Sequence, residues 1–191
     1  EMAERVAAML REEAPRPGRA PFIGTFHSLG ARVLRVEGKL LGRTSRFVIF
    51  DNHDSVQLIR RILKDLEIGK EKGSGPAWYL DRISRVKSGM SSWEEIESSR
   101  KPQDKWVRRV FDSYEEELAK NNAFDFDDLL EKTVRLFRER PEVRAKYERM
   151  FPYLLVDEYQ DLNNIQYDLV RILAESSRQI SVLGDDQQTI Y

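Results

Sequence analysis

The stretch Tyr153-Leu154-Leu155-Val156-Asp157-Glu158-Tyr159-Gln160-Asp161 decides the fold of this chain. Its four consecutive apolar residues predict a strand that is buried on both faces, as in a parallel sheet. In open α/β sheets the ligand binds beyond the carboxyl ends of the strands, so Asp157 and Glu158 stand where chemistry is expected. A phosphate held by a metal ion would explain why two acids end a buried strand.

A second predicted strand, Ile180-Ser181-Val182-Leu183, leads into Gly184-Asp185-Asp186-Gln187-Gln188. Gly184 lets the backbone turn or approach a ligand closely. The Gln188 amide can donate to a phosphate oxygen and accept from a water, which suits a sensor of the nucleotide state. Each stretch alone also has a structural explanation. An acid of the first stretch would cap the next helix, and the glutamines would belong to a polar loop.

The segment Pro21–Phe26 predicts a short strand, and the motif Gly24-Thr25-Phe26-His27-Ser28 lies at its end. Hydroxyls, an imidazole and the N-terminus of a following helix can all donate to phosphates. Phe26 either stacks on a base or packs in the core, and the core is the more common place. A single histidine such as His27 is likewise more often structural than a ligand.

The composition is typical of a globular protein. The chain has 191 residues, 40% hydrophobic and 34% charged, with a net charge of −1 at pH 7. This length allows one sizeable domain or two small ones, and the composition excludes a disordered chain. No apolar run approaches the length of a membrane span. The absence of cysteine excludes disulfides and thiolate metal sites and suits a reducing compartment, so we expect a cytoplasmic protein.

The charge is unevenly placed along the chain. Residues 1–50 carry nine Lys and Arg against five Asp and Glu, whereas residues 124–191 carry nine against fourteen. A basic first part and an acidic last part would suit a polyanion at one face and a metal ion at the other. Ordinary solvated surface is the more common explanation, and charge counts alone favour it.

The middle of the chain is predicted to be helical, with strands on both sides. Apolar residues at helical spacing predict helices over residues 51–67, 78–86, 92–96 and 103–121. The run Phe47–Phe50 is a short strand or a buried connector. The pattern predicts an α/β domain with an all-helical insertion. Residues 1–50 and 124–191 would form the α/β domain, and residues 51–123 the insertion.

Capping patterns mark further helices. Asp125 is a predicted N-cap, with Asp128 three residues on, of a helix that ends before Pro141. Asn163 and Gln166 form a capping-box pattern ahead of another helix. Helices are also expected over residues 2–13, 27–41 and 142–150.

No Walker A loop is present in the sequence. The nearest segment, Gly38-Lys39-Leu40-Leu41-Gly42-Arg43-Thr44, has three residues between its glycines instead of four and Arg in place of Lys. It also follows a predicted helix rather than a strand. It is therefore rejected as a phosphate-binding loop.

Taken together, the motifs resemble the UvrD/Rep/PcrA-type superfamily 1 DNA helicases, in the order in which that family carries them. The segments that carry the resemblance are Gly24–Ser28, Phe124–Leu130, Leu155–Asp161 and Leu183–Tyr191. The resemblance implies part of a RecA-like parallel-sheet motor domain of the P-loop NTPase type, with an inserted helical subdomain. It also implies that the Walker A segment lies before residue 1 and the second motor domain after residue 191, so we expect residues 1–191 to be inactive by themselves.

Carried over by position, the resemblance implies an ATP site. Asp157 would hold Mg²⁺, and Glu158 would be the catalytic base for the water that attacks ATP. Gln160 would belong to the nucleotide site, and Gln188 would contact the γ-phosphate. Gln187 stands where the family often has Asp.

The resemblance also implies contacts with DNA. Thr25, Phe26 and His27 would contact the DNA strand, and Tyr191 would stack near a base. The expected parent is an ATP-dependent helicase that moves 3′ to 5′ on single-stranded DNA and unwinds duplexes in repair or replication. Its partners would be single-stranded and junction DNA, together with the missing second motor domain.

The residues themselves leave two other functions open. A non-catalytic nucleic-acid-binding module would use basic and aromatic side chains of the predicted insertion to neutralise phosphates and stack bases. These side chains are Trp78, Arg82, Arg85, Lys87, Trp93, Arg100, Lys101, Lys105, Trp106, Arg108 and Arg109. Fourteen acids in residues 51–123 offset them, which favours a structural role. A metal-dependent phosphodiesterase would instead be built on Asp157, Glu158 and Asp185.

Overall fold

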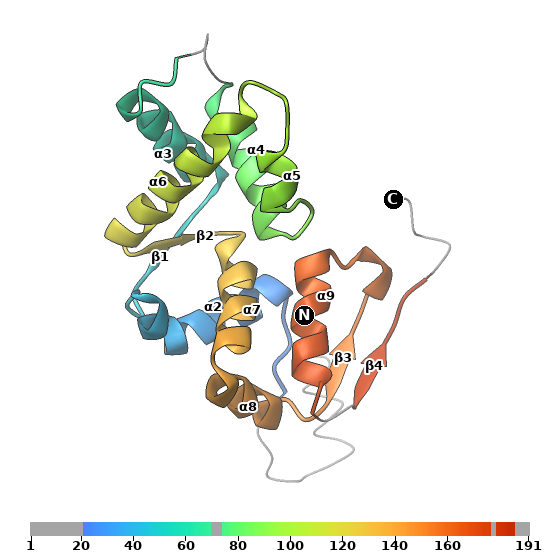
Figure 1. The fold of residues 1–191 in the computed structure, drawn as a ribbon. Helices are drawn as coiled ribbons and strands as arrows, with labels where there is room; N and C mark the ends of the chain where they lie inside the picture. Colours follow the sequence, from blue (N-terminus) through green and yellow to red (C-terminus); the bar gives the residue numbers. More distant parts are fainter. Residues whose placement is uncertain (1–20, 70–73, 177–178, 186–191) are drawn as a thin grey trace.

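The computed structural model describes residues 21–69, 74–176 and 179–185. Its helices in chain order are α2 (Phe26–Glu37), α3 (Asn52–Asp65), α4 (Pro76–Lys87), α5 (Trp93–Glu97), α6 (Val107–Lys120), α7 (Asp128–Glu139), α8 (Pro141–Met150) and α9 (Asn164–Ala174) (Figure 1). The helices predicted from apolar spacing are confirmed to within a few residues, and the one expected over residues 2–13 lies outside the described ranges. None of the described helices has the length and apolar character needed to cross a membrane.

The strands form two separate parallel pairs. Strand β1 (Val48–Phe50) pairs with β2 (Ala123–Asp125), and the helices α3 to α6 lie between them in the chain. Strand β3 (Leu154–Val156) pairs with β4 (Ile180–Val182), and α9 makes the crossover. The fold is therefore mixed α/β with short parallel strands, as the sequence predicts. Because strands β3 and β4 are parallel, their carboxyl ends lie at the same edge.

The prediction that the β3 strand is buried on both faces is wrong. Leu155 is 72% exposed, whereas Val156 is buried and Leu154 packs on the core formed by α7, α8 and α9. Successive side chains of a strand point to opposite faces, so the apolar run covers both faces but only one is packed. Within the described ranges the pair has no third strand, and no helix lies over Leu155.

The short strand predicted over Pro21–Phe26 is also wrong. Helix α2 already begins at Phe26, and Thr25 is its N-cap: the Ser28 backbone N–H donates to Thr25 Oγ1 at 3.2 Å. A capping side chain competes with strand formation because it satisfies a backbone donor of the helix. Phe26 is half-buried and packs on the same core as Leu154.

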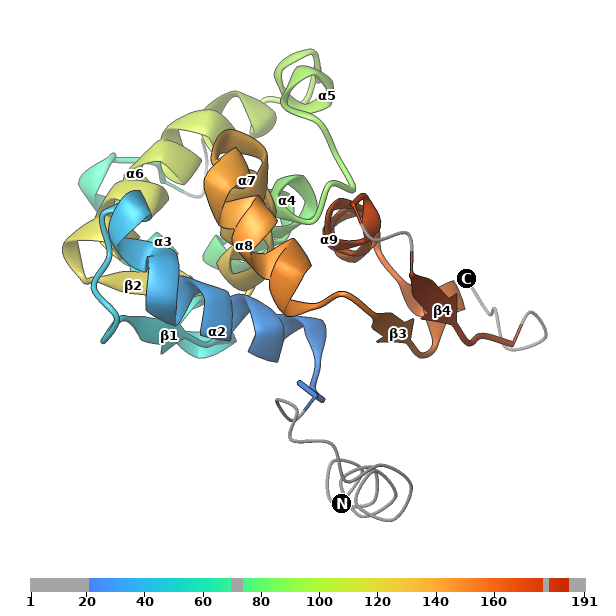
Figure 2. The ribbon, with the colours of Figure 1, turned by 90° about the horizontal axis from the view of Figure 1, so that it is seen from below.

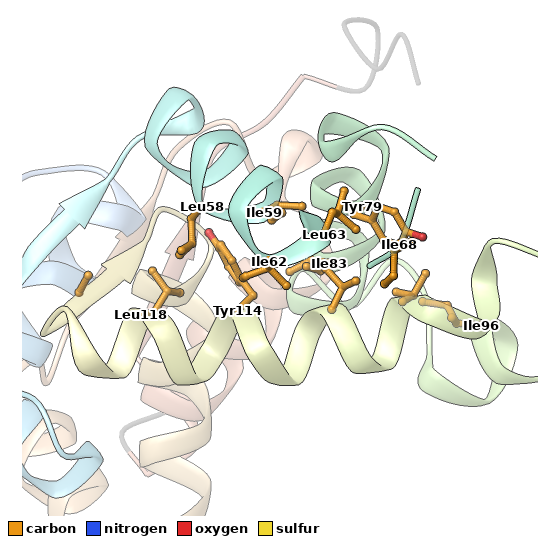
Figure 3. Packing of buried hydrophobic residues seen from close by; sticks show 13 residues of the cluster. Leu58, Ile59, Ile62, Leu63, Ile68, Tyr79, Ile83, Ile96, Tyr114 and Leu118 are labelled. Atoms are coloured by element: carbon orange, nitrogen blue, oxygen red, sulfur yellow. The ribbon is translucent and has the colours of Figure 1, made fainter. Parts of the chain in front are cut away.

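Helices α3, α4, α5 and α6, called here the helical unit, share a hydrophobic core of their own. Leu58 and Ile62 of α3 meet Ile83 of α4 and Tyr114 of α6 (Figure 3). The helical spacing of these apolar residues gives each helix one buried face. Asp51 begins α3 in a reciprocal capping box with Asp54. The unit lies at one end of the molecule, away from the pair β3 and β4 (Figure 1).

Helices α2 and α7 lie side by side and cross closely at Gly30 (Figure 2). A Cβ added to Gly30 would lie 2.1 Å from the backbone oxygen of Leu129, the second residue of α7. The absence of a side chain therefore permits this helix crossing. The crossing brings the N-terminal ends of the two helices together.

We expect Gly30→Ala to destabilise the protein, because the clash is with backbone and cannot be relieved by a rotamer change. The loss is about 1–3 kcal/mol, typical of overpacking, and it exceeds the gain of about 1 kcal/mol that Ala brings to a helix. Gly38→Ala is the matched control. Gly38 has a φ of −57°, and a Cβ added there would lie 3.6 Å from its nearest neighbour, so Ala fits. Urea denaturation measures the free energy of unfolding of both variants. Equal stability of the two would contradict the close approach of α2 and α7 at Gly30.

Candidate functional site

The acidic end of β3 has an unusual backbone. Glu158 has φ 51° and ψ 43°, in the left-handed region, and its backbone N–H donates a hydrogen bond to Asp157 Oδ1 at 3.0 Å. Residues with a side chain adopt this region at a cost of about 1–2 kcal/mol. Such conformations cluster at functional sites. Asp157 and Glu158 are both exposed, and neither forms an ion pair with another described residue.

Gln160 joins the two strand ends through both atoms of its amide. Its Nε2 donates to Glu158 Oε2 at 2.7 Å, and its Oε1 accepts from the Asp185 backbone N–H at 3.3 Å. A Cβ on Gly184 would lie 2.6 Å from the same Gln160 oxygen, so a side chain at this position would displace the Gln160 amide. The segments that follow β3 and β4 therefore lie close together in the structure.

The next helix does not use these acids as caps. Asn163 caps α9 in a reciprocal capping box with Gln166, as the sequence predicts. The alternative that Asp157 or Asp161 caps this helix is therefore wrong. Both carboxylates of Asp157 and Glu158 stay available to solvent, and their oxygens are the hard donors that Mg²⁺ prefers.

The three acids of the phosphodiesterase hypothesis do not gather around one point. Within residues 21–69, 74–176 and 179–185 there is no group of three or more acidic or histidine side chains placed to hold a metal ion. Asp157, Glu158 and Asp185 are all in these ranges. The described residues therefore give no support to a metal site built from these three acids. Gln188 and Tyr191, also predicted as site residues, lie outside the described ranges.

A second candidate surface lies where α2 and α7 begin. The ring of His27 stacks on that of Phe126, with centroids 4.1 Å apart and planes 23° from parallel. Phe126 is 55% exposed. Thr25, the N-cap of α2 and two residues before His27 in the chain, is also exposed. Burial lowers the pKa of His27, while the nearby Asp127 carboxylate raises it by a smaller amount. His27 is therefore neutral at pH 7 and offers a flat ring rather than a charge.

Phe126 was not predicted as a site residue. It lies in Phe124-Asp125-Phe126-Asp127-Asp128, where an aromatic residue alternates with acids ahead of an amphipathic helix. Phe124 lies in β2 and is buried, whereas Phe126 lies just beyond the end of that strand and is exposed. Strand alternation would place both rings on one face, so no local pattern in this motif marks Phe126 as the exposed ring.

The predicted basic and aromatic surface of the helical unit is only partly present. Lys87 is buried, so it cannot contact the phosphates of a nucleic acid, and that prediction is wrong. Trp78 and Trp93 are half-buried against the core of the unit, and the Arg108 guanidinium lies 4.5 Å from the Trp93 ring centroid. The two tryptophans therefore pack at the edge of the hydrophobic core of the helical unit. The basic residues of the predicted set that are exposed are Arg85, Arg100, Lys101, Lys105, Arg108 and Arg109.

Short parallel strands, with paired acids after β3 and a glutamine that bridges to the segment after β4, define a mixed α/β protein. The model of the UvrD/REP helicase N-terminal domain family matches residues 1–191. The chain belongs to this family.

Several curated relatives of the chain are named as ATP-dependent DNA helicases. It is 36% identical to the ATP-dependent DNA helicase PcrA of Leuconostoc citreum, over all of this chain and 25% of that protein. It is 34% identical to the proteins of the same name from Staphylococcus aureus and Staphylococcus epidermidis, over all of this chain and 26% of each. The chain thus spans about a quarter of the length of these relatives.

We expect two substitutions to move the pKa of His27 in opposite directions. Phe126→Ala exposes the imidazole to water and raises its pKa toward the ordinary value of 6.5, because burial is the main cause of the lowering. Asp127→Asn removes a carboxylate that favours the charged ring and lowers the pKa further. Proton–carbon NMR titration of the imidazoles of His27 and His53, the only histidines of the chain, measures this. Shifts of the same sign would contradict the assigned causes.

Proposed function

We propose that this chain is part of an ATP-driven DNA helicase and contributes the hydrolysis half of its ATP site. The observation that carries the proposal is the Gln160 amide, which links Glu158 to the backbone of Asp185 at the common edge of two parallel strands. Family membership and the name of the relatives support it. In this proposal the two strands belong to a RecA-like motor domain whose phosphate-gripping loop and partner domain lie in the rest of the protein.

The proposed chemistry assigns a separate task to each polar residue. Asp157 holds Mg²⁺, which when bound neutralises charge on the phosphates of ATP. Glu158 accepts the proton of the attacking water, and Gln160 fixes the Glu158 carboxylate through the hydrogen bond of 2.7 Å. Gln188 contacts the γ-phosphate. Since the phosphate-gripping loop is not among these residues, residues 1–191 alone have no ATPase activity in this proposal.

The proposed DNA-contacting surface is formed by Thr25, His27 and Phe126, together with Tyr191. The stacked rings of His27 and Phe126 offer an exposed aromatic face, on which bases of single-stranded DNA can stack. The N-termini of α2 and α7 meet beside them, and helix N-termini favour phosphate. Phe26 is half-buried against the core, so we assign it a packing role next to this surface rather than a contact with a base. The expected substrates are single-stranded and junction DNA, with movement from 3′ to 5′.

The proposed domain organisation keeps residues 51–123 as a helical insertion between residues 1–50 and 124–191. The pairing of β1 with β2 supports it, because these strands stand immediately before and after that segment and bring its two ends together. The separate hydrophobic core of the helical unit supports it as well.

A second candidate function, duplex or junction binding by the helical unit, is favoured by the six residues of the predicted basic set that are exposed. They would contact the DNA backbone without reading its sequence. Binding of this kind weakens steeply with salt. A salt titration of duplex binding by the full-length protein, with Arg100 and Lys101 both replaced by Ala, tests it: an unchanged slope would exclude a role for these two residues.

In the full-length protein, we expect Glu158→Gln to lower DNA-stimulated ATP hydrolysis by about 10²- to 10⁴-fold, because the amide cannot accept the proton of the attacking water. The substitution keeps the shape of the side chain, so DNA binding should be retained. Glu142→Gln, at an exposed acid in the first turn of α8, is the control and should hydrolyse ATP normally. A Glu158→Gln enzyme with normal turnover would remove Glu158 from the catalytic role.

We also expect Phe126→Ala to weaken the binding of single-stranded DNA by about 1–3 kcal/mol, the usual contribution of one stacked base. The dependence on salt should not change, because phosphate contacts remain. Val36→Ala, at an exposed position near the other end of α2, is the control. Fluorescence anisotropy with a labelled oligothymidylate measures both, and equal affinity of the two variants would rule out base stacking on Phe126.

A further inference from the structure

A buried lysine joins the helical unit to the rest of the protein. Lys87, the last residue of α4, is 3% exposed, and its Nζ lies 2.8 Å from Glu115 Oε1, 2.7 Å from Asp125 Oδ2 and 2.8 Å from Asp128 Oδ1. The four residues come from α4, α6, β2 and α7. Lys132 of α7 adds a second ammonium group, 2.6 Å from Glu115 and 3.4 Å from Asp128.

The charges of this cluster depend on one another. Burial alone lowers the pKa of Lys87, but the carboxylates of Asp128, Asp125 and Glu115 raise it well above its ordinary value. The three carboxylates therefore favour the charged form of Lys87. Asp125 and Asp128 are 3% and 1% exposed, so without this ammonium group they would be buried carboxylates facing one another.

Asp125 and Asp128 form the two ends of the turn that carries Phe126. The Asp128 N–H donates to Asp125 Oδ1 at 2.8 Å, and the Asp125 N–H donates to Asp128 Oδ2 at 3.1 Å. Lys87 binds the remaining oxygen of each carboxylate. The turn is thus closed twice, once by its own backbone and once by a side chain of the helical unit.

Phe126 lies between these two anchored residues and points away from them. Its ring is 55% exposed and its centroid lies 4.1 Å from that of the His27 ring, whereas Asp125 and Asp128 are buried. A turn of two intervening residues has few ways to change while both ends are held. The position of the Phe126 ring therefore depends on whether Lys87 holds both carboxylates.

We propose that Lys87 is a positioning residue of the DNA-contacting surface: through Asp125 and Asp128 it holds Phe126 against His27. The proposal rests on the proposed function, because it assigns Lys87 to a surface that contacts single-stranded DNA. In this proposal the helical unit helps to position the DNA-contacting surface, although Lys87 itself does not touch the DNA. A displacement of α4 at Lys87 is transmitted to the aromatic pair through two ion pairs.

The test is a double-mutant cycle in the full-length protein, with labelled oligothymidylate as the probe. We expect Phe126→Ala to weaken binding by about fivefold to 150-fold and Lys87→Met by about fivefold or more, since a released turn no longer presents the ring. The variant with both substitutions should bind no more weakly than Phe126→Ala alone, because Lys87 acts only through Phe126. In the Lys87→Met protein, NMR titration should also show the pKa of His27 closer to 6.5 than in the unmodified protein.

Lys132→Met is the matched control, because it removes the same charge from the same cluster but leaves the contacts of Lys87 with Asp125 and Asp128 in place. It should keep DNA affinity close to that of the unmodified protein. If Lys87→Met does not give the circular dichroism spectrum of a folded protein, the variant Lys87→Met with Glu115→Gln removes one charge of each sign and takes its place in the cycle.

The outcomes separate the two proposals. If Phe126→Ala binds DNA as the unmodified protein does, the proposed DNA surface is wrong and the role of Lys87 falls with it. If Phe126→Ala weakens binding while folded Lys87→Met does not, only the role of Lys87 is overturned. Losses that multiply in the combined variant, or an equal loss in Lys132→Met, would show that Lys87 acts on stability alone and would also overturn it.

Discussion

The complete pairing of the buried Lys87 ammonium group is the constraint on which the arrangement of the two parts of this protein depends. Apolar packing within the helical unit is non-directional and fixes no single orientation toward the remainder of the chain. A buried charge does fix one, because it must meet its partners at hydrogen-bonding distance or lose a large free energy. The partners of Lys87 come from α6, β2 and α7, so only one placement of α4 satisfies all three.

The proposed ATP site is held by a different kind of interaction. There the groups are exposed, and one neutral amide, that of Gln160, connects the ends of β3 and β4. A single hydrogen bond at the surface contributes little to stability, commonly about 0.5–1.5 kcal/mol. The arrangement thus suits a site whose groups must change partners when a nucleotide binds. The left-handed backbone of Glu158 is consistent with this, because strain at that residue is not repaid by packing.

Local chemistry allowed much of the fold to be predicted from the sequence. The capping box of Asn163 begins α9 where expected, because a side chain and a backbone N–H only three residues apart decide where the helix starts. The meeting of the β3 and β4 ends was also predictable, since parallel neighbours share an edge. The strand expected at Pro21–Phe26 failed because one capping residue, Thr25, outweighed a short apolar run. The exposure of Leu155 was not predictable, because it depends on which layers cover the sheet.

Lys87 shows why the remaining features could not be found in the same way. In the sequence it is one of many basic residues on a helix, and its partner Asp125 is 38 positions away. No local pattern separates a lysine that faces water from one that faces two buried acids. The information lies instead with the acids, because Asp125 and Asp128 close a turn just ahead of a helix whose apolar face is buried. Carboxylates placed at such a position are carried into the interior with the helix, and a cation from elsewhere in the chain has to accompany them.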